Sequence, residues 1–177
     1  MFVKEKHDVI IEYYPFADSI KEKILSDSSK FPLIREKYNW DGGLTNVRAL
    51  QMEPIDHPDQ NFSSVNLLFD WILNLVRNQK YIKSQHLLFK IDHFWIANYE
   101  KGDFTIPHHH HPSHWSFVYF LNSPKGSSPL VFTTSGKKIK AEDGKVVIFA
   151  GEVLHHVPKN KCDGRIVLAG NLTRIIN

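Results

Sequence analysis

The second half of the chain is a succession of short segments rich in aromatic and β-branched residues, and this pattern constrains the fold more than any other feature. Clusters of glycine, proline, serine and acidic residues separate the segments and favour turns. The segments are 94–99, 115–121, 129–132, 145–149 and 166–169. Strands at such intervals are typical of a sandwich, a barrel or a jelly roll. We therefore predict a mainly β region from about residue 88 onward.

The first half of the chain combines one strand pattern with two helical patterns. Residues 9–14 form an apolar stretch that predicts a strand. The pair Asp18-Ser19 is typical of an N-cap and predicts a helix through Ile20, Ile24 and Leu25. Residues 64–79 carry apolar side chains at i, i+3, i+4 and i+7. This spacing predicts an amphipathic helix that packs one face on a sheet.

The whole chain is expected to form one domain. Its 177 residues are enough to bury most of the apolar surface without disulfide bonds. Turn-forming sequences at 41–43 and 53–58 separate the two predicted helices. We therefore predict a single domain, 1–177, in which residues 1–87 support a β core with flanking helices, and residues 88–177 form that core.

Composition and charge exclude several classes of protein. Hydrophobic residues make up 42% of the chain and charged residues 23%, as in ordinary globular domains. The formal net charge is +3, but basic and acidic residues are interleaved, so we expect no nucleic-acid partner. The single Cys162 cannot form an internal disulfide, and we find neither a run of roughly 18 apolar residues nor a signal peptide. We therefore expect a cytoplasmic protein with no membrane partner.

Histidines are concentrated in one part of the chain. Seven of the eleven lie from His108 to His156, in two clusters. Alternate side chains of an extended segment share a face, so His108 and His110 form a pair suited to chelating a metal. A third imidazole can come from His155 or His156, after a predicted strand. Three imidazoles favour iron, zinc, copper or nickel over calcium or magnesium, and leave coordination positions open for a substrate.

Several motifs between about residues 92 and 172 occur in an order known from one enzyme superfamily. They are Tyr99-x-x-Gly102, His108-x-His110, the segments 116–122 and 128–132, Gly144-x-x-x-x-Phe149, His155-x-Val157 and Gly164-Arg165. This order resembles that of the 2-oxoglutarate- and iron(II)-dependent oxygenases. The similarity is greatest to the prolyl-hydroxylase-like branch, including the small members that are common in marine phage genomes.

The resemblance implies a double-stranded β-helix, or jelly roll, with a defined set of site residues. In the family, the first and distal histidines bind iron, and a basic residue about ten positions after the distal one binds the far carboxylate of 2-oxoglutarate. Carried over to this sequence, these residues are His108, His155 and Arg165. The ten-residue step to Arg165 favours His155 over His156 as the distal ligand.

One position departs from the family pattern. The second metal ligand of the family is usually an aspartate, whereas this sequence has His110 there. Replacing the carboxylate by an imidazole removes one negative charge from the metal ligands. Two alternatives follow: a three-histidine iron centre, or a site completed by a nearby acid such as Asp103 or Glu152.

The cupins, which share the double-stranded β-helix, are a second family with His-x-His. The first half of their motif matches the sequence from Gly102 to His110, and Gly144 stands at the cupin distance from His155. The glutamate, proline and second glycine of the cupin motifs are replaced here. Arg165 favours the oxygenase, because a guanidinium forms paired hydrogen bonds with a carboxylate.

The resemblance therefore implies an Fe(II)- and 2-oxoglutarate-dependent dioxygenase that consumes O₂ and hydroxylates a prolyl or other amino-acid side chain in a peptide or protein. The expected site residues are the metal ligands His108, His110 and His155 and the co-substrate contacts Arg165, Tyr99 and Tyr119. No catalytic residue is expected beyond the metal centre. The alternatives are a cupin-type three-histidine dioxygenase that uses no 2-oxoglutarate, and a non-enzymatic cupin that binds a metal or small molecule. A phage-encoded protein would act in the host cytoplasm.

Overall fold

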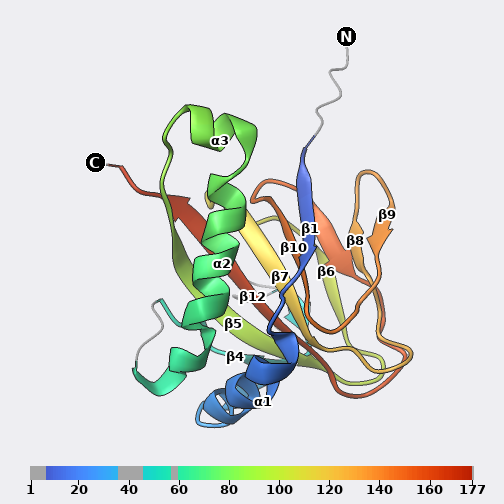
Figure 1. The fold of residues 1–177 in the computed structure, drawn as a ribbon. Helices are drawn as coiled ribbons and strands as arrows, with labels where there is room; N and C mark the ends of the chain where they lie inside the picture. Colours follow the sequence, from blue (N-terminus) through green and yellow to red (C-terminus); the bar gives the residue numbers. More distant parts are fainter. Residues whose placement is uncertain (1–6, 36–45, 57–59, 177) are drawn as a thin grey trace.

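Two antiparallel sheets form the body of the molecule, and helices cover the outer face of the larger sheet (Figure 1). The computed structural model describes residues 7–35, 46–56 and 60–176. The larger sheet has the strand order β1-β10-β7-β12-β5-β4-β2, and the smaller has the order β3-β6-β11-β8-β9. This is the mainly β architecture, with two sheets and flanking helices, that the sequence predicts.

The elements have the following bounds. The strands of the larger sheet are β1 (Val9–Tyr13), β2 (Leu33–Ile34), β4 (Leu50–Met52), β5 (Phe89–Tyr99), β7 (Trp115–Asn122), β10 (Lys145–Ala150) and β12 (Arg165–Arg174). Those of the smaller sheet are β3 (Val47–Arg48), β6 (Phe104–His108), β8 (Leu130–Phe132), β9 (Lys137–Ile139) and β11 (His155–Val157). The helices are α1 (Ala17–Ser28), α2 (Asn66–Arg77), α3 (Lys80–Ser84) and the 3₁₀ segment η1 (Gln60–Val65).

The central strands of the larger sheet are buried on both faces, and their alternate residues enter two different cores. On β7, the side chains of Phe117, Tyr119 and Leu121 belong to the core between the sheet and the helices. Val118 and Phe120 belong to the core between the two sheets. Successive side chains of a strand point to opposite faces of the sheet. When both faces are buried, the sequence of the strand is therefore a continuous apolar run.

Helix α2 packs along the outer face of the larger sheet (Figure 1). Its apolar side chains recur at helical spacing and four of them are buried, namely Leu68, Phe69, Ile72 and Val76. The Phe69 ring meets the edges of Phe94 on β5 and Phe117 on β7, with centroids 5.0 and 5.8 Å apart. These contacts fix the helix over the strands whose opposite faces line the space between the sheets.

The five predicted strands of the second half are present as β5, β7, β8, β10 and β12. The predicted strand at 9–14 is β1, which pairs with β10 along its whole length. Strands from the first half of the chain thus complete both sheets, since β4 also pairs with β5 and β3 pairs with β6.

The helices differ from the sequence prediction mainly at their ends. Helix α1 begins at Ala17 after Phe16, with no side-chain cap, so the prediction that Asp18-Ser19 form the cap is wrong and Asp18 lies in the first turn. The predicted helix 64–79 is α2, shortened because residues before Asn66 form the 3₁₀ segment.

Two predicted turns fall partly or wholly outside the described ranges. The turn at 41–43 lies outside the described residues, as do residues 57–59 of the predicted loop 53–58. Within that loop, Ile55 forms an isolated bridge with Phe94 of β5. None of the described helices has the length and apolar character needed to span a membrane.

Candidate metal centre

The smaller sheet brings two of the histidines side by side. His108 is the last residue of β6 and His155 is the first of β11, and the two are direct partners in the antiparallel register. Their ring centroids are 4.3 Å apart. Register therefore selects His155, because its neighbour His156 points to the other face of the strand and its Nδ1 lies 2.8 Å from the hydroxyl of Thr133.

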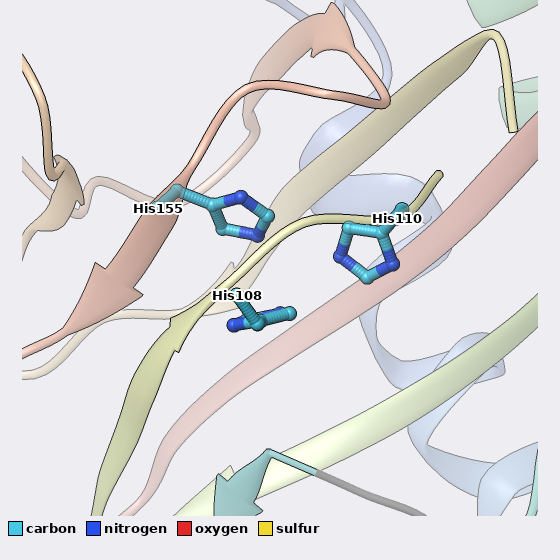
Figure 2. A group of neighbouring side chains, drawn as sticks. All are labelled: His108, His110 and His155. Atoms are coloured by element: carbon cyan, nitrogen blue, oxygen red, sulfur yellow. The ribbon is translucent and has the colours of Figure 1, made fainter. Parts of the chain in front are cut away.

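His110 reaches the same place from a loop. The prediction that it shares a strand with His108 is wrong, because β6 ends at His108. The chain beyond β6 is held by the backbone N–H of His110, which donates to the carbonyl of Gly151 at 2.6 Å. Figure 2 shows the three side chains converging from β6, from the loop after it and from β11.

The three imidazoles are close enough to share one metal ion. One ring nitrogen from each of His108, His110 and His155 lies within 4.8 Å of the other two. The Nδ1–H of His108 donates to the carbonyl of Ile106 at 2.8 Å, and that of His155 donates to the carbonyl of Val153 at 2.9 Å. With Nδ1 protonated in this way, the Nε2 of each of these two rings keeps its lone pair for a metal.

Burial keeps the cluster uncharged. It lowers the pKa of His110 to about 2 and that of His155 to about 3, with the neighbouring histidines adding to both effects. The pKa of His108 is also lowered, again mainly by burial. Neutral imidazole is the form that binds metals, so the site has its ligands ready at neutral pH.

Neither of the acids considered from the sequence lies with the histidines. Asp103 accepts hydrogen bonds from the guanidinium of Arg35 and from the backbone of Glu100. The carboxylate of Glu152 lies 3.5 Å from Nδ1 of His7. Among the described residues, the group that could hold a metal ion therefore consists of three histidines and contains no carboxylate.

Arg165 lies in the same pocket as the histidines, between the two sheets. Its side chain is fully buried. Its Nε donates to the carbonyl of Ser128 at 3.0 Å, but Nη1 and Nη2 have no hydrogen-bond partner among the described residues. The guanidinium carbon lies 4.5 Å from the ring centroid of Tyr99 and 5.5 Å from that of Phe120.

An unpaired buried guanidinium is costly, because its charge has lost water and gained no anion. Burial accordingly lowers the pKa of Arg165, and the neighbouring Tyr99 partly offsets this effect. A guanidinium nevertheless stays protonated in proteins. The two free Nη groups are the donors that would form paired hydrogen bonds with a carboxylate.

The structure separates the two tyrosines predicted for the co-substrate. Tyr99 lines the pocket, and its hydroxyl is hydrogen-bonded to that of Thr105 at 2.7 Å. Tyr119 lies on the opposite face of the larger sheet, where its ring meets Tyr14 edge-on. Tyr119 therefore lies away from the pocket, because its strand directs odd-numbered residues toward the helices.

Two pocket residues were not selected from the sequence. Trp95 and Thr105 both line the pocket beside the histidines, although neither is among the site residues expected from the sequence. The available signal was the alternation on β5, which places Trp95, Ala97 and Tyr99 on one face.

Comparison with known proteins gives structural similarity only. No protein-family model matches the sequence, and no curated protein matches it. A Pseudomonas putida prolyl-4-hydroxylase aligns with a TM-score of 0.69 at 18% identity, covering 96% of this chain and 94% of that one. The viral collagen prolyl hydroxylase of Paramecium bursaria chlorella virus 1, in its 2-oxoglutarate complex, aligns with a TM-score of 0.63 at 16% identity and 97% coverage of both chains.

The fold is that of the prolyl hydroxylases. A third structure with it is a Trichoplax adhaerens prolyl hydroxylase in complex with a hypoxia-inducible factor peptide, with a TM-score of 0.67 and 13% identity over 92% of this chain and 82% of that one. The prolyl-hydroxylase fold confirms the predicted double-stranded β-helix. At these identities the likeness concerns architecture, and activity is argued below from the site.

Proposed function

We propose that this protein is a 2-oxoglutarate- and Fe(II)-dependent dioxygenase of the hydroxylase type. The observation that carries the proposal is the unpaired, fully buried guanidinium of Arg165 in the same pocket as three neutral histidines. A metal-binding cluster and a separate carboxylate-binding group are the two features that a chelating dicarboxylate such as 2-oxoglutarate requires.

The donor set fits a catalytic transition metal. His108, His110 and His155 would hold Fe(II) through neutral imidazole nitrogens, a ligand type suited to iron. Three protein ligands leave coordination positions for other molecules, as catalytic sites do. The carbonyls of Ile106 and Val153 orient two of the rings before any metal binds.

The pocket also fits the far carboxylate of 2-oxoglutarate. Arg165 offers two free Nη groups, while its Nε is held by the carbonyl of Ser128 and its plane is packed against Tyr99 and Phe120. The guanidinium of Arg165 is therefore held in one orientation before the ligand binds. The hydroxyls of Tyr99 and Thr105 add hydrogen-bonding capacity on the same wall.

Bound iron, 2-oxoglutarate and O₂ would together supply oxidative hydroxylation of a C–H bond. The chain's own part is to hold the 2-oxo acid between Arg165 and the histidines and to exclude water. Valine and alanine side chains between the sheets provide the apolar lining. A water-poor site strengthens the contact between guanidinium and carboxylate.

For the substrate we propose a prolyl or other amino-acid side chain in a peptide or protein. The support is the shared fold: one structural neighbour is a collagen prolyl hydroxylase, and another was solved with a hypoxia-inducible factor peptide. For the compartment we propose the reducing cytoplasm, because the single Cys162 has no second cysteine for an internal disulfide.

A second candidate function follows from the missing carboxylate. A three-histidine dioxygenase that uses no 2-oxoglutarate, or a metal-binding cupin without activity, would have the same ligands among the described residues. Neither candidate explains why a guanidinium should be buried beside these histidines with no hydrogen-bond partner for its Nη groups among the described residues. Arg165 is therefore the residue that separates the candidates.

The test is anaerobic titration of metal-free protein with Fe(II) and then 2-oxoglutarate, followed by visible absorption. We expect the weak charge-transfer band of a chelated 2-oxo acid only when both are present. Arg165→Met keeps most of the side-chain volume and removes the charge, and should weaken 2-oxoglutarate binding about tenfold or more, the loss of a charged hydrogen-bonded pair.

Arg174→Ala serves as the control, because Arg174 is an exposed arginine at the far end of the same strand and should leave the titration unchanged. Iron binding without the band in the wild-type protein would contradict the proposal and favour the three-histidine alternative. Unchanged 2-oxoglutarate affinity in folded Arg165→Met would remove its main support.

A further inference from the structure

The three metal-ligating histidines are not anchored alike. His108 and His155 each donate an Nδ1–H to a backbone carbonyl two residues earlier in the chain. The ring of His110 has no hydrogen bond to any described residue, and only its backbone N–H is held, by Gly151. A ligand ring normally has its second nitrogen occupied by such a partner, which sets its orientation.

Ring contacts hold His110 instead. Its centroid lies 4.9 Å from that of His108 and 5.1 Å from that of His155. These two rings belong to the same three-histidine group, so contacts with them do not tie the His110 ring to the rest of the protein. The third ring against it is Trp95, with centroids 5.7 Å apart and planes tilted by 33°.

Trp95 is itself fixed from its other side. It is nearly buried on β5, where it pairs with Ala169 of β12. The ring of His93 stacks on it at 5.8 Å with an interplanar angle of 23°. His93 is in turn held by Asp92, at 3.2 Å from Nδ1, and by the side-chain amide of Asn171, which donates to Nε2 at 2.8 Å.

We propose that Trp95 is a positioning residue for His110: its indole, packed against His93 on the other side, sets the orientation of the metal-ligating ring that has no hydrogen-bond partner among the described residues. The inference rests on the three-histidine metal centre of the proposed function and does not depend on 2-oxoglutarate. A rigid aromatic side chain can take the place of a hydrogen bond, because an imidazole packed against it has few other orientations open to it.

The test uses the full chain with Co(II) as the probe, because its visible spectrum reports ligand geometry. Trp95→Met removes the ring while keeping bulk in the core. We expect its Co(II) affinity to fall about tenfold or more, as when a ligand loses its outer partner, and its ligand-field bands to shift. Trp95→Phe restores an aromatic face and should bind within about threefold of the wild type with its spectrum restored.

Trp115→Met is the matched control. Trp115 is partly buried and packs against the core on the helix side of the larger sheet, so its loss removes a tryptophan that does not line the pocket. The control should keep both the wild-type Co(II) affinity and the wild-type spectrum. A Trp95→Met protein that binds Co(II) as tightly as the wild type with the same spectrum would overturn the proposal.

His93→Ala keeps the proposal testable if Trp95→Met does not fold, because the His93 side chain is about one-third exposed and its loss leaves the core intact. We expect a change in the Co(II) bands in the same direction with a smaller loss of affinity. An unchanged spectrum in His93→Ala would then overturn the proposal. Failure of the wild-type protein to bind Co(II) would instead overturn the metal centre itself, which distinguishes the two failures.

Discussion

Arg165 and His110 are the two residues of the site whose side chains lack expected hydrogen-bond partners among the described residues. Arg165 has two donors without acceptors, and His110 has a ring without a hydrogen bond among the described residues. The Arg165 side chain is buried and His110 is partly buried, so bulk water does not fully replace a missing hydrogen-bond partner. An anion would satisfy the first residue and a metal ion the second, which is the physical basis of the proposed dicarboxylate and metal site.

The identity of the second ligand provides a test at the scale of one residue. His110→Asp restores a carboxylate to the metal ligands, so we expect this variant to bind Fe(II) and keep the 2-oxoglutarate-dependent band. His110→Ala removes the ligand, and its Fe(II) affinity should fall by more than the roughly tenfold to hundredfold that loss of an outer partner of a ligand causes.

The measurement for both His110 variants is the anaerobic titration described above, together with consumption of 2-oxoglutarate in air. If the protein is instead a three-histidine dioxygenase that uses no 2-oxoglutarate, His110→Asp should lose activity, because one of its three required imidazole ligands is replaced by a carboxylate. Loss of both metal binding and band in folded His110→Asp would therefore argue against the proposed co-substrate.

At the scale of elements, the site depends on strands that come from distant parts of the chain. The first strand, β1, closes one edge of the larger sheet against β10. Polar contacts reinforce this edge, since the Tyr13 hydroxyl and the Lys145 ammonium both bond the carboxylate of Glu142. Together with Lys140, these contacts lower the pKa of Glu142 to about 2.

This ion cluster predicts a pH dependence of stability. The folded-state pKa of Glu142 lies below its ordinary value of 4.5, so its contribution is fully present above that value and is lost as the pH falls toward 2. Glu142→Gln should therefore lower the free energy of unfolding modestly near neutrality and flatten its decline over the acid range. Urea unfolding of both proteins at about pH 7 and about pH 3 checks this. If the free energy of unfolding falls equally with pH in the wild type and in Glu142→Gln, the Glu142 carboxylate does not contribute to stability.

At the scale of the whole molecule, metal binding and folding are linked. The ligands come from β6, the loop after it and β11, and they converge only when the smaller sheet has formed (Figure 2). The unfolded chain offers no such site, so a metal that binds the folded protein must stabilise it.

The linkage predicts a metal-dependent melting temperature. Co(II) at about 100 times its dissociation constant should add about 2.7 kcal/mol to the free energy of unfolding, which raises Tm by about 5–10 °C for a chain of this size. A chelator should reverse the shift. We expect no shift in His155→Ala and a wild-type shift in His156→Ala, since His156 bonds Thr133 instead. Equal shifts in the two variants would contradict the assignment of His155.

Many strands and several candidate site residues could be predicted from the sequence. The strand positions followed from short β-branched and aromatic runs between turn residues, because such runs suit a pleated buried surface. The His-x-His pair was selected because alternate imidazoles of an extended segment share a face. These features are local in the chain, and local patterns suffice to predict them, whereas His155 and Arg165 were selected through the resemblance to the oxygenases.

The tertiary structure decided which face of each element meets the pocket. Alternation separates Tyr119 from Val118 but cannot say which of them faces the histidines, because both faces of β7 are buried and equally apolar. Strand pairing placed His155 beside His108, and packing left Nη1 and Nη2 of Arg165 without a hydrogen-bond partner among the described residues. Register and packing are long-range properties, set by strands that lie far apart in the chain, so only the folded structure could determine them.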